Sequence, residues 1–267
     1  MQLSRPLGEA ALAPDDPIDN LLLEEFLEVN RGLAVDVLIV IPAYNEADSL
    51  PGVLDRMPET IAGHRVAILV ISDGSTDGTA KAAADRGVLT IAAPINRGQG
   101  AALKLGYLAA IRLKARYVAV VDADGQWDPA DLSFAVDILD SGSATFVQGS
   151  RVLGSSEVGD SFRDLGVTFF GWLISLLIGT KITDTSSGIR AFTTGAIDGI
   201  RLDQPQYQSS ELLIAAAMSG AAVREFPVTM SKRTAGSSKK AKNALYGWYY
   251  LRAVIRTFLR EFRTPRP

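Results

Sequence analysis

The sequence predicts an α/β fold in which helices flank a mostly parallel central sheet. Continuous apolar runs of strand length alternate with helical patterns over the first half of the chain, which is typical of parallel strands buried on both faces. Polar clusters follow three of these runs, at the strand ends where parallel sheets bind their ligands. With 267 residues, 47% of them hydrophobic, the chain can bury the core of one such domain.

The regular elements are expected after residue 34, because residues 1–34 are acidic and predict only a partly helical extension. The strands expected in the regular part are 35–41, 66–71, 88–92, 117–121 and 145–147. The helices expected between them are 47–57, 77–86, 98–114 and 129–140. Beyond Gly149 we expect, in order, a polar loop, a helix, a strand, a helix and a strand, at 154–160, 164–178, 188–192, 210–219 and 223–228. We therefore divide the chain into an extension (1–34), one α/β domain (35–240) and a C-terminal amphipathic helix (241–267).

Composition excludes several kinds of active site. The chain has no cysteine, so it has no disulfide, no zinc–thiolate site and no cysteine nucleophile, which fits a reducing compartment. Its one histidine, His64, lies in a polar stretch, and we expect a solvated loop residue rather than a catalytic or metal-binding one. The acidic N-terminus lacks the features of a signal peptide, and the apolar stretch 165–179 is shorter than the roughly 20 residues that span a bilayer, so we expect a cytoplasmic protein.

Three predicted strands end in polar clusters at the same edge of the sheet, in the segments 42–46, 72–79 and 122–126. Each cluster alone would also fit a turn or a helix cap, but three at one edge indicate a binding site. Asp122 and Asp124 are two positions apart, so both carboxylates can face one divalent cation, with the carboxamide oxygen of Gln126 as a third ligand. Such oxygen ligands suit Mg²⁺ or Mn²⁺ and leave coordination positions open for the phosphates of a nucleoside diphosphate.

Two other nucleotide-binding classes are disfavoured. Gly98-Gln99-Gly100 resembles the start of a dinucleotide-binding fingerprint, but Leu103 stands at the third glycine position. The P-loop sequence G-x-x-x-x-G-K-[ST] does not occur, which excludes a P-loop NTPase at the level of motifs.

The polar clusters belong to six motifs that resemble, in the same order, those of family 2 glycosyltransferases and in particular the dolichol-phosphate mannose synthase branch. The motifs lie between residues 36 and 240 and are Pro42–Glu46, Asp73–Thr79, Asn96–Gly98, Asp122–Gln126, Asp184–Arg190 and Arg233–Lys239. The resemblance implies a GT-A fold with a single Rossmann-like domain, and an inverting, metal-dependent transferase. Its donor would be a nucleoside-diphosphate sugar such as GDP-mannose or a UDP-sugar. Its acceptor would be a polyprenyl phosphate of the dolichyl or undecaprenyl type.

The same resemblance implies roles for individual residues. The nucleotide would be bound by Pro42, Tyr44, Glu46, Asp73 and Asp122. The metal would be bound by Asp122, Asp124 and Gln126, and the donor phosphates by Arg233 and Lys239. Catalysis would rest on Asp124 together with Arg151 and Arg163, the two arginines that would receive the acceptor phosphate.

The chemistry of the acceptor separates the remaining alternatives. A phosphate monoester is already anionic at neutral pH, so it needs positioning and charge compensation by guanidinium groups rather than a general base. A soluble hydroxyl acceptor, the first alternative, would need a base, for which Glu211 or Asp184 is the candidate. A catalytically silent sugar-nucleotide-binding scaffold is the second alternative. A nucleotidyltransferase would need a glycine-rich loop near the first strand, which is missing.

Three positions depart from the family pattern and leave the sugar open. Ser72 stands where a second acidic residue is often found, Gln99 where lysine is frequent, and Trp127 where histidine is common.

The C-terminal segment is basic and amphipathic. Residues 231–267 contain ten Lys and Arg residues and one acidic residue, Glu261, so an anionic partner is expected. From Leu245 onward, apolar residues recur every three or four positions beside a stripe of arginines. This helix either packs on the enzyme core or, together with the apolar segment around Phe169 and Trp172, contacts the inner face of the membrane as a peripheral anchor. We expect no nucleic-acid partner, and the sequence is compatible with a homo-oligomer.

Overall fold

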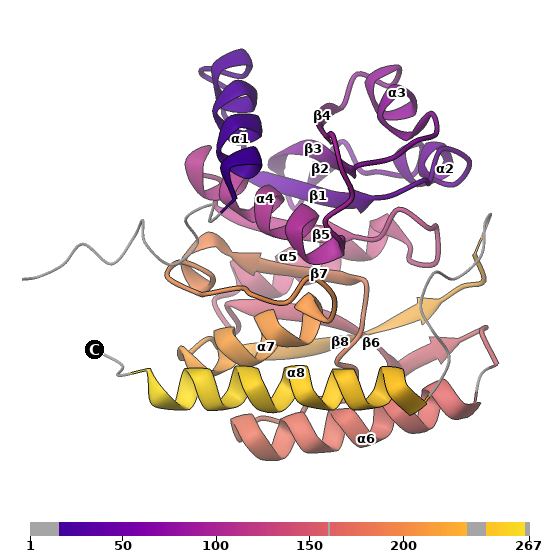
Figure 1. Cartoon of the computed structure of the whole chain (residues 1–267), viewed down its shortest axis with the longest axis vertical. Helices are drawn as coiled ribbons and strands as arrows, with labels where there is room; N and C mark the ends of the chain where they lie inside the picture. The colour runs from indigo at the N-terminus through magenta and orange to yellow at the C-terminus, as the bar shows by residue number, and fades with distance from the viewer. Residues whose placement is uncertain (1–15, 160, 234–243, 265–267) are drawn as a thin grey trace, which may run out of the picture.

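One mixed sheet runs through the molecule, and helices cover both of its faces (Figure 1). The computed structural model describes residues 16–159, 161–233 and 244–264, with the backbone alone at 161–163 and 244–246. The strands are β1 Val37–Ala43, β2 Thr60–Ile61, β3 His64–Asp73, β4 Leu89–Ala93, β5 Tyr117–Val121, β6 Phe146–Ser156, β7 Ile189–Thr193 and β8 Val223–Met230. The helices are α1 Pro17–Val29, α2 Leu50–Leu54, α3 Thr79–Ala84, α4 Gln99–Arg112, α5 Leu132–Asp140, α6 Ser161–Ile178, α7 Gln208–Met218 and α8 Ala244–Arg263, with 3₁₀ turns η1 Pro129–Asp131 and η2 Thr194–Ala196.

The strand order is β2-β3-β1-β5-β7-β6-β8, and β4 pairs with the second half of β3. Strands β4, β3, β1 and β5 are parallel to one another, and β6 is parallel to β8. Strand β7 lies between β5 and β6 and is antiparallel to both. Consequently the carboxyl ends of β1, β3, β5, β6 and β8 meet at one edge of the sheet, where β7 begins.

Side chains alternate between two hydrophobic cores, as they must in strands whose two faces are both covered. On β1, Leu38 and Val40 face the core shared with α1, α4, α6, α7 and α8. Val37, Ile39 and Ile41 face the core shared with α2, α3 and α5. This two-sided burial explains why the predicted strands are continuous apolar runs.

The largest difference from the expected elements is the length of β6. We expected a strand at 145–147 and a polar loop at 154–160, but β6 extends to Ser156, where it pairs with Met230 of β8. The pairing skips over an irregularity between Ser150 and Ser155, and a Cβ on Gly154 would lie 2.2 Å from the Val228 carbonyl oxygen. Exposed residues 152–156 are held in the strand by backbone hydrogen bonds, which leave no hydrophobic pattern in the sequence.

His64 is not the solvated loop residue that we expected. It is the first residue of β3, its side chain is 18% exposed, and its Nε2 lies 2.6 Å from Asp140 Oδ2. The ring also packs edge-on against Tyr117, whose hydroxyl donates to the same carboxylate at 2.5 Å. His64 therefore joins β3 to the C-terminal end of α5, away from the functional edge.

Part of the N-terminal extension is integrated into the fold. Helix α1 is capped by Asp16, whose carboxylate accepts from the Ile18 N–H, and it packs against α4 and β4. Leu23 and Phe26 are buried in the core that α4 also lines. The apolar face noted in the acidic segment is thus a packing surface.

Helix α8 packs on the core with one side, as one interpretation of its sequence expects, and exposes large apolar residues on another. Tyr250, Ala253 and Val254 are buried against the core, whereas Trp248 and Phe262 are 62% and 72% exposed. Helix α6 lies beside α8 (Figure 1) and also exposes large apolar residues, including Trp172 at 61%. In the part of the chain that is described, no helix combines the length and apolarity needed to cross a membrane.

Gly106 sets the distance between α4 and the sheet, so Gly106→Ala should destabilise the protein. An added Cβ would lie 2.3 Å from Val40 Cγ1, on a central strand that cannot move aside. We expect a loss of about 1–3 kcal/mol in the free energy of unfolding, measured by urea denaturation. Gly166→Ala is the control, because nothing lies within 4 Å of a Cβ there and alanine should stabilise α6 slightly. Equal effects of both substitutions would contradict the close approach at Gly106.

Candidate functional site

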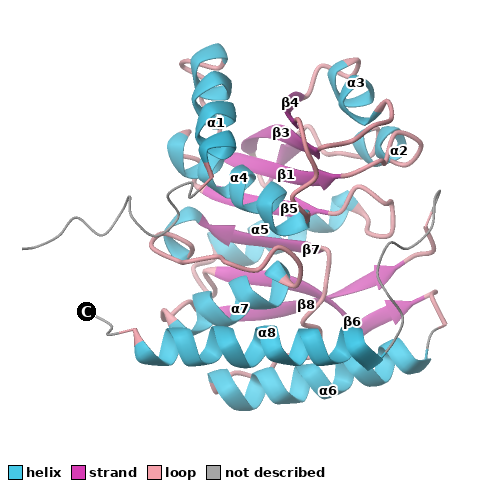
Figure 2. Ribbon diagram, in the orientation of Figure 1, coloured by secondary structure: helices cyan, strands magenta, loops and turns pink. Residues whose placement is uncertain are grey.

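The polar motifs converge where the parallel strands end, as the sequence predicts. Tyr44 to Glu46 follow β1, Asp73 ends β3, Asp122 to Gln126 follow β5, and Arg151 lies on β6. Two further segments reach the same edge, because β7 starts there after Asp184 to Gly188 and β8 ends there before Arg233 (Figure 2). The fold therefore brings six distant segments to one place.

Asp124 is a buried acid of this edge. The residue is 7% exposed, and its Oδ1 accepts from the Gln126 backbone N–H at 3.1 Å. Burial, and after it the negative charge of Asp122, raise the pKa of the Asp124 carboxyl to about 6, while Arg233 opposes the shift. A buried carboxylate beside a second one is stabilised by a positive charge.

Arg233 supplies that charge in this structure. Its Nη2 lies 2.7 Å from Asp124 Oδ2, and its Nη1 lies 3.9 Å from Glu46 Oε1. The guanidinium thus stands where acidic side chains from β1 and β5 face each other, which shows that the geometry favours a cation there.

Asp122 is held by two neutral neighbours. Its Oδ1 accepts from Gln99 Nε2 at 3.0 Å, and its backbone N–H donates to the Gly188 carbonyl at 3.1 Å. A Cβ on Gly188 would lie 2.1 Å from Asp122 Oδ2 and 2.4 Å from Trp127 Nε1, so glycine is required for this contact. Among the described residues, the side chain that donates to the Asp122 carboxylate is thus the neutral amide of Gln99.

The donor set fits a divalent cation. Asp122 and Asp124 offer carboxylate oxygens, and Gln126 is held in place because its Nε2 donates to the Ser231 carbonyl at 3.1 Å. That bond uses the amide nitrogen and not the oxygen that would ligate a metal. Within residues 16–159, 161–233 and 244–264, no group of three or more His, Cys, Asp or Glu side chains is arranged to hold a metal. A cation here would take two carboxylates and an amide from the protein and complete its shell with ligand oxygens.

The loops after β1 and β3 are locked together. Asn45 has a left-handed backbone with φ of 51°, and its Oδ1 accepts from the Thr76 N–H at 2.8 Å. The Glu46 N–H donates to Thr79 Oγ1 at 2.9 Å. Tyr44 is 36% exposed beside this joint, and Pro42 lies within β1 opposite Ile71 of β3. Two of the predicted nucleoside residues, Tyr44 and Glu46, are therefore presented on a rigid double loop.

Asp73 is engaged by the backbone of the segment that follows β4. Its Oδ2 accepts from the backbone N–H groups of Arg97 and Gly98, both at 2.8 Å, and Arg97 Nε lies 3.4 Å from its Oδ1. Arg97 also pairs with Asp19 of α1, which is 4% exposed, and lies 3.5 Å from Asp16. Burial raises the pKa of the Asp19 carboxyl, while the hydrogen bond from Arg97 opposes the shift. Asp73 thus fixes the 96–98 turn, and α1 contacts the same turn through the ion pair between Asp19 and Arg97.

The glycines at 98 and 100 have a packing explanation. The Gly100 N–H donates to the Pro205 carbonyl at 2.9 Å, and a Cβ on Gly100 would lie 2.1 Å from the Gln204 carbonyl oxygen. Gly98 has φ of 96°, and its own Cβ would lie 2.8 Å from the Pro205 carbonyl oxygen. Their spacing reflects close approach to the 204–205 segment rather than a dinucleotide fingerprint.

Arg151 lies in a buried, bidentate ion pair. Its Nε and Nη2 lie 2.7 and 2.9 Å from the two carboxylate oxygens of Asp184, whose side chain is fully buried. Nη2 also donates to Ser186 Oγ at 2.9 Å, and Nη1 faces the sulfur of Met230 at 3.1 Å. The guanidinium lies over the Trp127 ring, 5.5 Å from its centroid. Among the described residues, Nη1 has the Met230 sulfur as its partner, whereas Nε and Nη2 are bound to protein oxygens.

The two candidate bases are both occupied by structural partners. Asp184 accepts from Arg151 and from the Ser186 N–H. Glu211 is 2% exposed and accepts from the N–H groups of Asp203 and Gln204 at 2.9 and 2.8 Å, and from Arg260 Nη1 at 2.8 Å. Neither carboxylate is presented to an acceptor.

The remaining predicted residues are placed only in part. Arg163 belongs to α6, but its side chain lies outside the described part of the chain, and Lys239 lies outside the described residues altogether. Sequence analysis did not single out Asp19, since nothing in the sequence links it to a turn 78 positions away. It also missed the Arg151–Asp184 pair, although both residues belong to motifs that it used.

Comparison with known proteins identifies relatives of this chain. Residues 38–201 match the family described as "Glycosyl transferase family 2". Polyprenol monophosphomannose synthase of Mycolicibacterium smegmatis is 33% identical over 216 residues, which cover 76% of this chain and 80% of that protein. Undecaprenyl-phosphate mannosyltransferase of Micrococcus luteus is 29% identical over 214 residues, covering 76% and 86%.

A solved structure shares the architecture. It is glucosyl-3-phosphoglycerate synthase from Mycobacterium tuberculosis in complex with Mn²⁺ and uridine-diphosphate-glucose, with a TM-score of 0.60 and 19% identity. The match covers 98% of this chain and 89% of that one. At this identity the likeness concerns the fold alone, and it confirms the GT-A-like fold that the motifs implied.

The buried pair predicts that Asp184→Asn will destabilise the protein strongly. The substitution leaves the guanidinium of Arg151 buried without a counter-charge, which costs about 3–5 kcal/mol. The measurement is the midpoint of urea denaturation. Replacing both partners, as Arg151→Met with Asp184→Leu, should restore much of the loss because no buried charge remains. The control is Asp36→Asn, which breaks an exposed pair with Arg65 and should change stability little. A loss at Asp184 no larger than at Asp36 would refute the argument.

Proposed function

The chain belongs to glycosyl transferase family 2, and from this we propose that it transfers a sugar from a nucleoside-diphosphate donor to a polyprenyl phosphate, with inversion at the anomeric carbon. The observation that carries the proposal is the pair of carboxylates after β5, Asp122 and Asp124, facing a guanidinium at the strand edge. The relatives named for polyprenol and undecaprenyl phosphate support the acceptor class. GDP-mannose or a UDP-sugar is the proposed donor.

The donor would lie across the carboxyl ends of β1, β3 and β5. Pro42, Tyr44, Glu46 and Asp73 are proposed to hold the nucleoside, with Asp73 acting through the 96–98 turn that it fixes. Asp122, Asp124 and Gln126 would hold Mg²⁺ or Mn²⁺, which would neutralise the diphosphate as it leaves. Arg233 would move from Asp124 to a donor phosphate when the cation takes its place, and Lys239 is proposed to assist it.

The acceptor phosphate would be received by Arg151 and Arg163. On Arg151, Nη1 is the group available for a phosphate oxygen, while Asp184 holds the rest of the fork in a fixed orientation. Fixed orientation is what an acceptor that is already anionic requires, because its reaction is limited by positioning and charge compensation. The engagement of Asp184 and Glu211 by other groups supports a reaction without a dedicated base.

The proposed location is the inner face of the cytoplasmic membrane, with the chain bound peripherally through α6 and α8. Both helices pack on the core with one side and expose aromatic and aliphatic residues with another. The exposed set is Leu165, Phe169, Trp172, Leu176, Trp248, Tyr249, Ile255, Leu259 and Phe262. A surface of this kind matches a lipid acceptor, whose phosphate lies at the membrane interface.

Asp124→Asn should lower kcat/KM for sugar transfer at least about 100-fold, since the site would lose a charge that holds the leaving group. The assay incubates the protein and Mn²⁺ with labelled nucleotide sugars, with and without a short polyprenyl phosphate. Chelation by EDTA should abolish transfer, and added Mn²⁺ or Mg²⁺ should restore it. Asp128→Asn, a change in the same loop at a residue that caps η1, should remain active. Full activity of Asp124→Asn would refute the mechanism, and transfer only to soluble hydroxyl acceptors would favour the alternative acceptor class.

Trp172→Ser combined with Trp248→Ser should release the protein from vesicles. Both side chains are more than 60% exposed, so their replacement removes apolar contact with lipid without opening the core. The measurement is co-sedimentation of the full chain with phospholipid vesicles. Phe134→Ser is the matched control, because Phe134 is 64% exposed on α5, which covers the opposite face of the sheet. Unchanged binding of the double variant, or equal loss in the control, would reject this membrane surface.

A further inference from the structure

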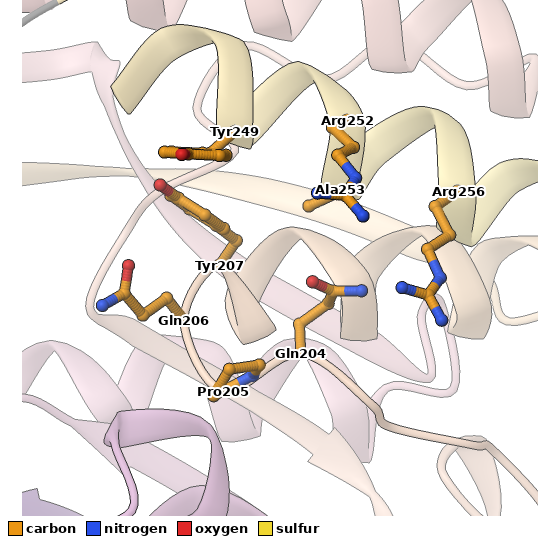
Figure 3. Close-up of a pocket in the computed structure, with 8 residues that line it drawn as sticks. All are labelled: Gln204, Pro205, Gln206, Tyr207, Tyr249, Arg252, Ala253 and Arg256. Carbon is orange, nitrogen blue, oxygen red and sulfur yellow. The ribbon is translucent and has the colours of Figure 1, made fainter. Parts of the chain in front are cut away.

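A cavity of about 220 Å³ lies between α8 and the segment that leads into α7 (Figure 3). Its lining includes Arg252 and Arg256, one helical turn apart on α8, and the two tyrosines Tyr207 and Tyr249. Gln204 and Gln206 add polar side chains to its wall, and among the residues that the structure describes no acidic one lines it. The cavity therefore presents two cations and several hydrogen-bonding groups to whatever enters it.

The two arginines differ from Arg260 on the same helix in their partners. Arg260 is bound by Asp203, Glu211 and Glu261, at 3.1, 2.8 and 2.8 Å. For Arg252 and Arg256 no acidic partner is found in the described ranges, and Figure 3 shows both side chains extending from α8 toward the segment that carries Gln204. Two neighbouring guanidinium groups without a carboxylate favour an anion, above all one with phosphate oxygens.

The wall opposite α8 is preformed. Tyr207 has φ of 50°, an uncommon conformation for a bulky residue, and it packs edge-on against the buried Tyr250. The N–H groups of Asp203 and Gln204 are bound to Glu211, and the Pro205 carbonyl accepts from Gly100. A ligand would meet a wall that is already ordered, which lowers the entropy cost of binding.

The surroundings indicate which kind of anion fits. Arg252 and Arg256 also border a second groove of about 690 Å³ along α8, whose apolar lining includes Trp248, Leu251, Ile255 and Leu259. A ligand with a phosphate group beside hydrocarbon would match the cavity and the groove together. A free nucleotide or inorganic phosphate would use the cavity alone.

We propose that this cavity, the α8 anion pocket, binds the phosphate of an anionic phospholipid headgroup when α8 lies on the membrane. The inference rests on the membrane contact of the proposed function and adds a defined lipid site, separate from the carboxylates after β5. The pocket shares a wall with the donor edge, because Pro205 holds Gly100 of the turn whose Gly98 N–H donates to Asp73. A lipid in the pocket would thus fix the orientation of the protein with its donor edge beside the membrane.

The test measures binding of the full chain to phosphatidylcholine vesicles with and without about 30% phosphatidylglycerol, at fixed ionic strength. Arg252→Gln with Arg256→Gln should lower the affinity for anionic vesicles at least about tenfold. Arg252→Lys with Arg256→Lys keeps the positive charges but removes the planar guanidinium groups, which donate paired hydrogen bonds to a phosphate. The affinity of this variant for anionic vesicles should lie between those of the wild type and the Gln variant. The matched control, Arg31→Gln with Arg56→Gln, removes the same charge just beyond α1 and α2, at the far end of the molecule from α8, and should change binding less than about twofold (Figure 1).

Three outcomes would overturn the pocket. The Gln variant could bind as tightly as the wild type, or the control pair could lose as much affinity, which would mean that general charge attraction suffices. Inorganic phosphate could bind to the arginines in solution and leave vesicle binding unaffected, which would assign the pocket to a free anion. Transfer to a short, water-soluble polyprenyl phosphate serves as the independent readout. If the Gln variant retains that activity and loses only its binding to anionic vesicles, the pocket is supported. Absence of transfer by the wild type as well would contradict the proposed acceptor but not the pocket.

Discussion

The arrangement of the site depends on one electrostatic constraint, the burial of the Asp124 carboxyl beside Asp122. Two carboxylates at a shielded strand end repel each other, and burial together with the charge of Asp122 raises the pKa of Asp124 to about 6. Arg233, in the segment that follows β8, supplies the compensating positive charge. The same segment also accepts a hydrogen bond from Gln126, 105 positions earlier in the chain, through the Ser231 carbonyl. The site therefore exists only because β1, β5 and β8 end at the same edge, where the antiparallel strand β7 begins.

The edge is stiffened by contacts that do not touch the carboxylates. Asn45 and Thr76 join two loops, Asp73 holds the 96–98 turn, and Asp19 reaches that turn through Arg97. Each link joins a strand end to another element, so that the polar side chains keep their positions although they lie on loops. This is the condition under which charge compensation, rather than proton transfer, can accelerate a reaction.

The strands and the position of the Asp122–Gln126 motif at the end of one of them could be predicted from sequence because both depend on local pattern. Runs such as 37–41 are apolar at every position since both faces are buried, and Asp122 and Asp124 directly follow such a run. The extended part of β6 could not be predicted, because backbone pairing with β8 holds exposed residues that have no pattern. The same holds for His64, whose burial depends on Asp140 and Tyr117, and for Asp19. Arg151 shows a further limit, since a motif names the residue but does not reveal that Asp184 occupies most of its guanidinium.

Helix α8 is connected to the 98–100 turn through one short segment. Arg260 binds Glu211 and Asp203, Glu211 in turn binds the backbone at 203 and 204, and Pro205 holds Gly100. Together with the peptide bond between residues 204 and 205, these contacts form a continuous path from α8 to the 98–100 turn. The packing therefore makes α8 an integral part of the fold rather than an appendage.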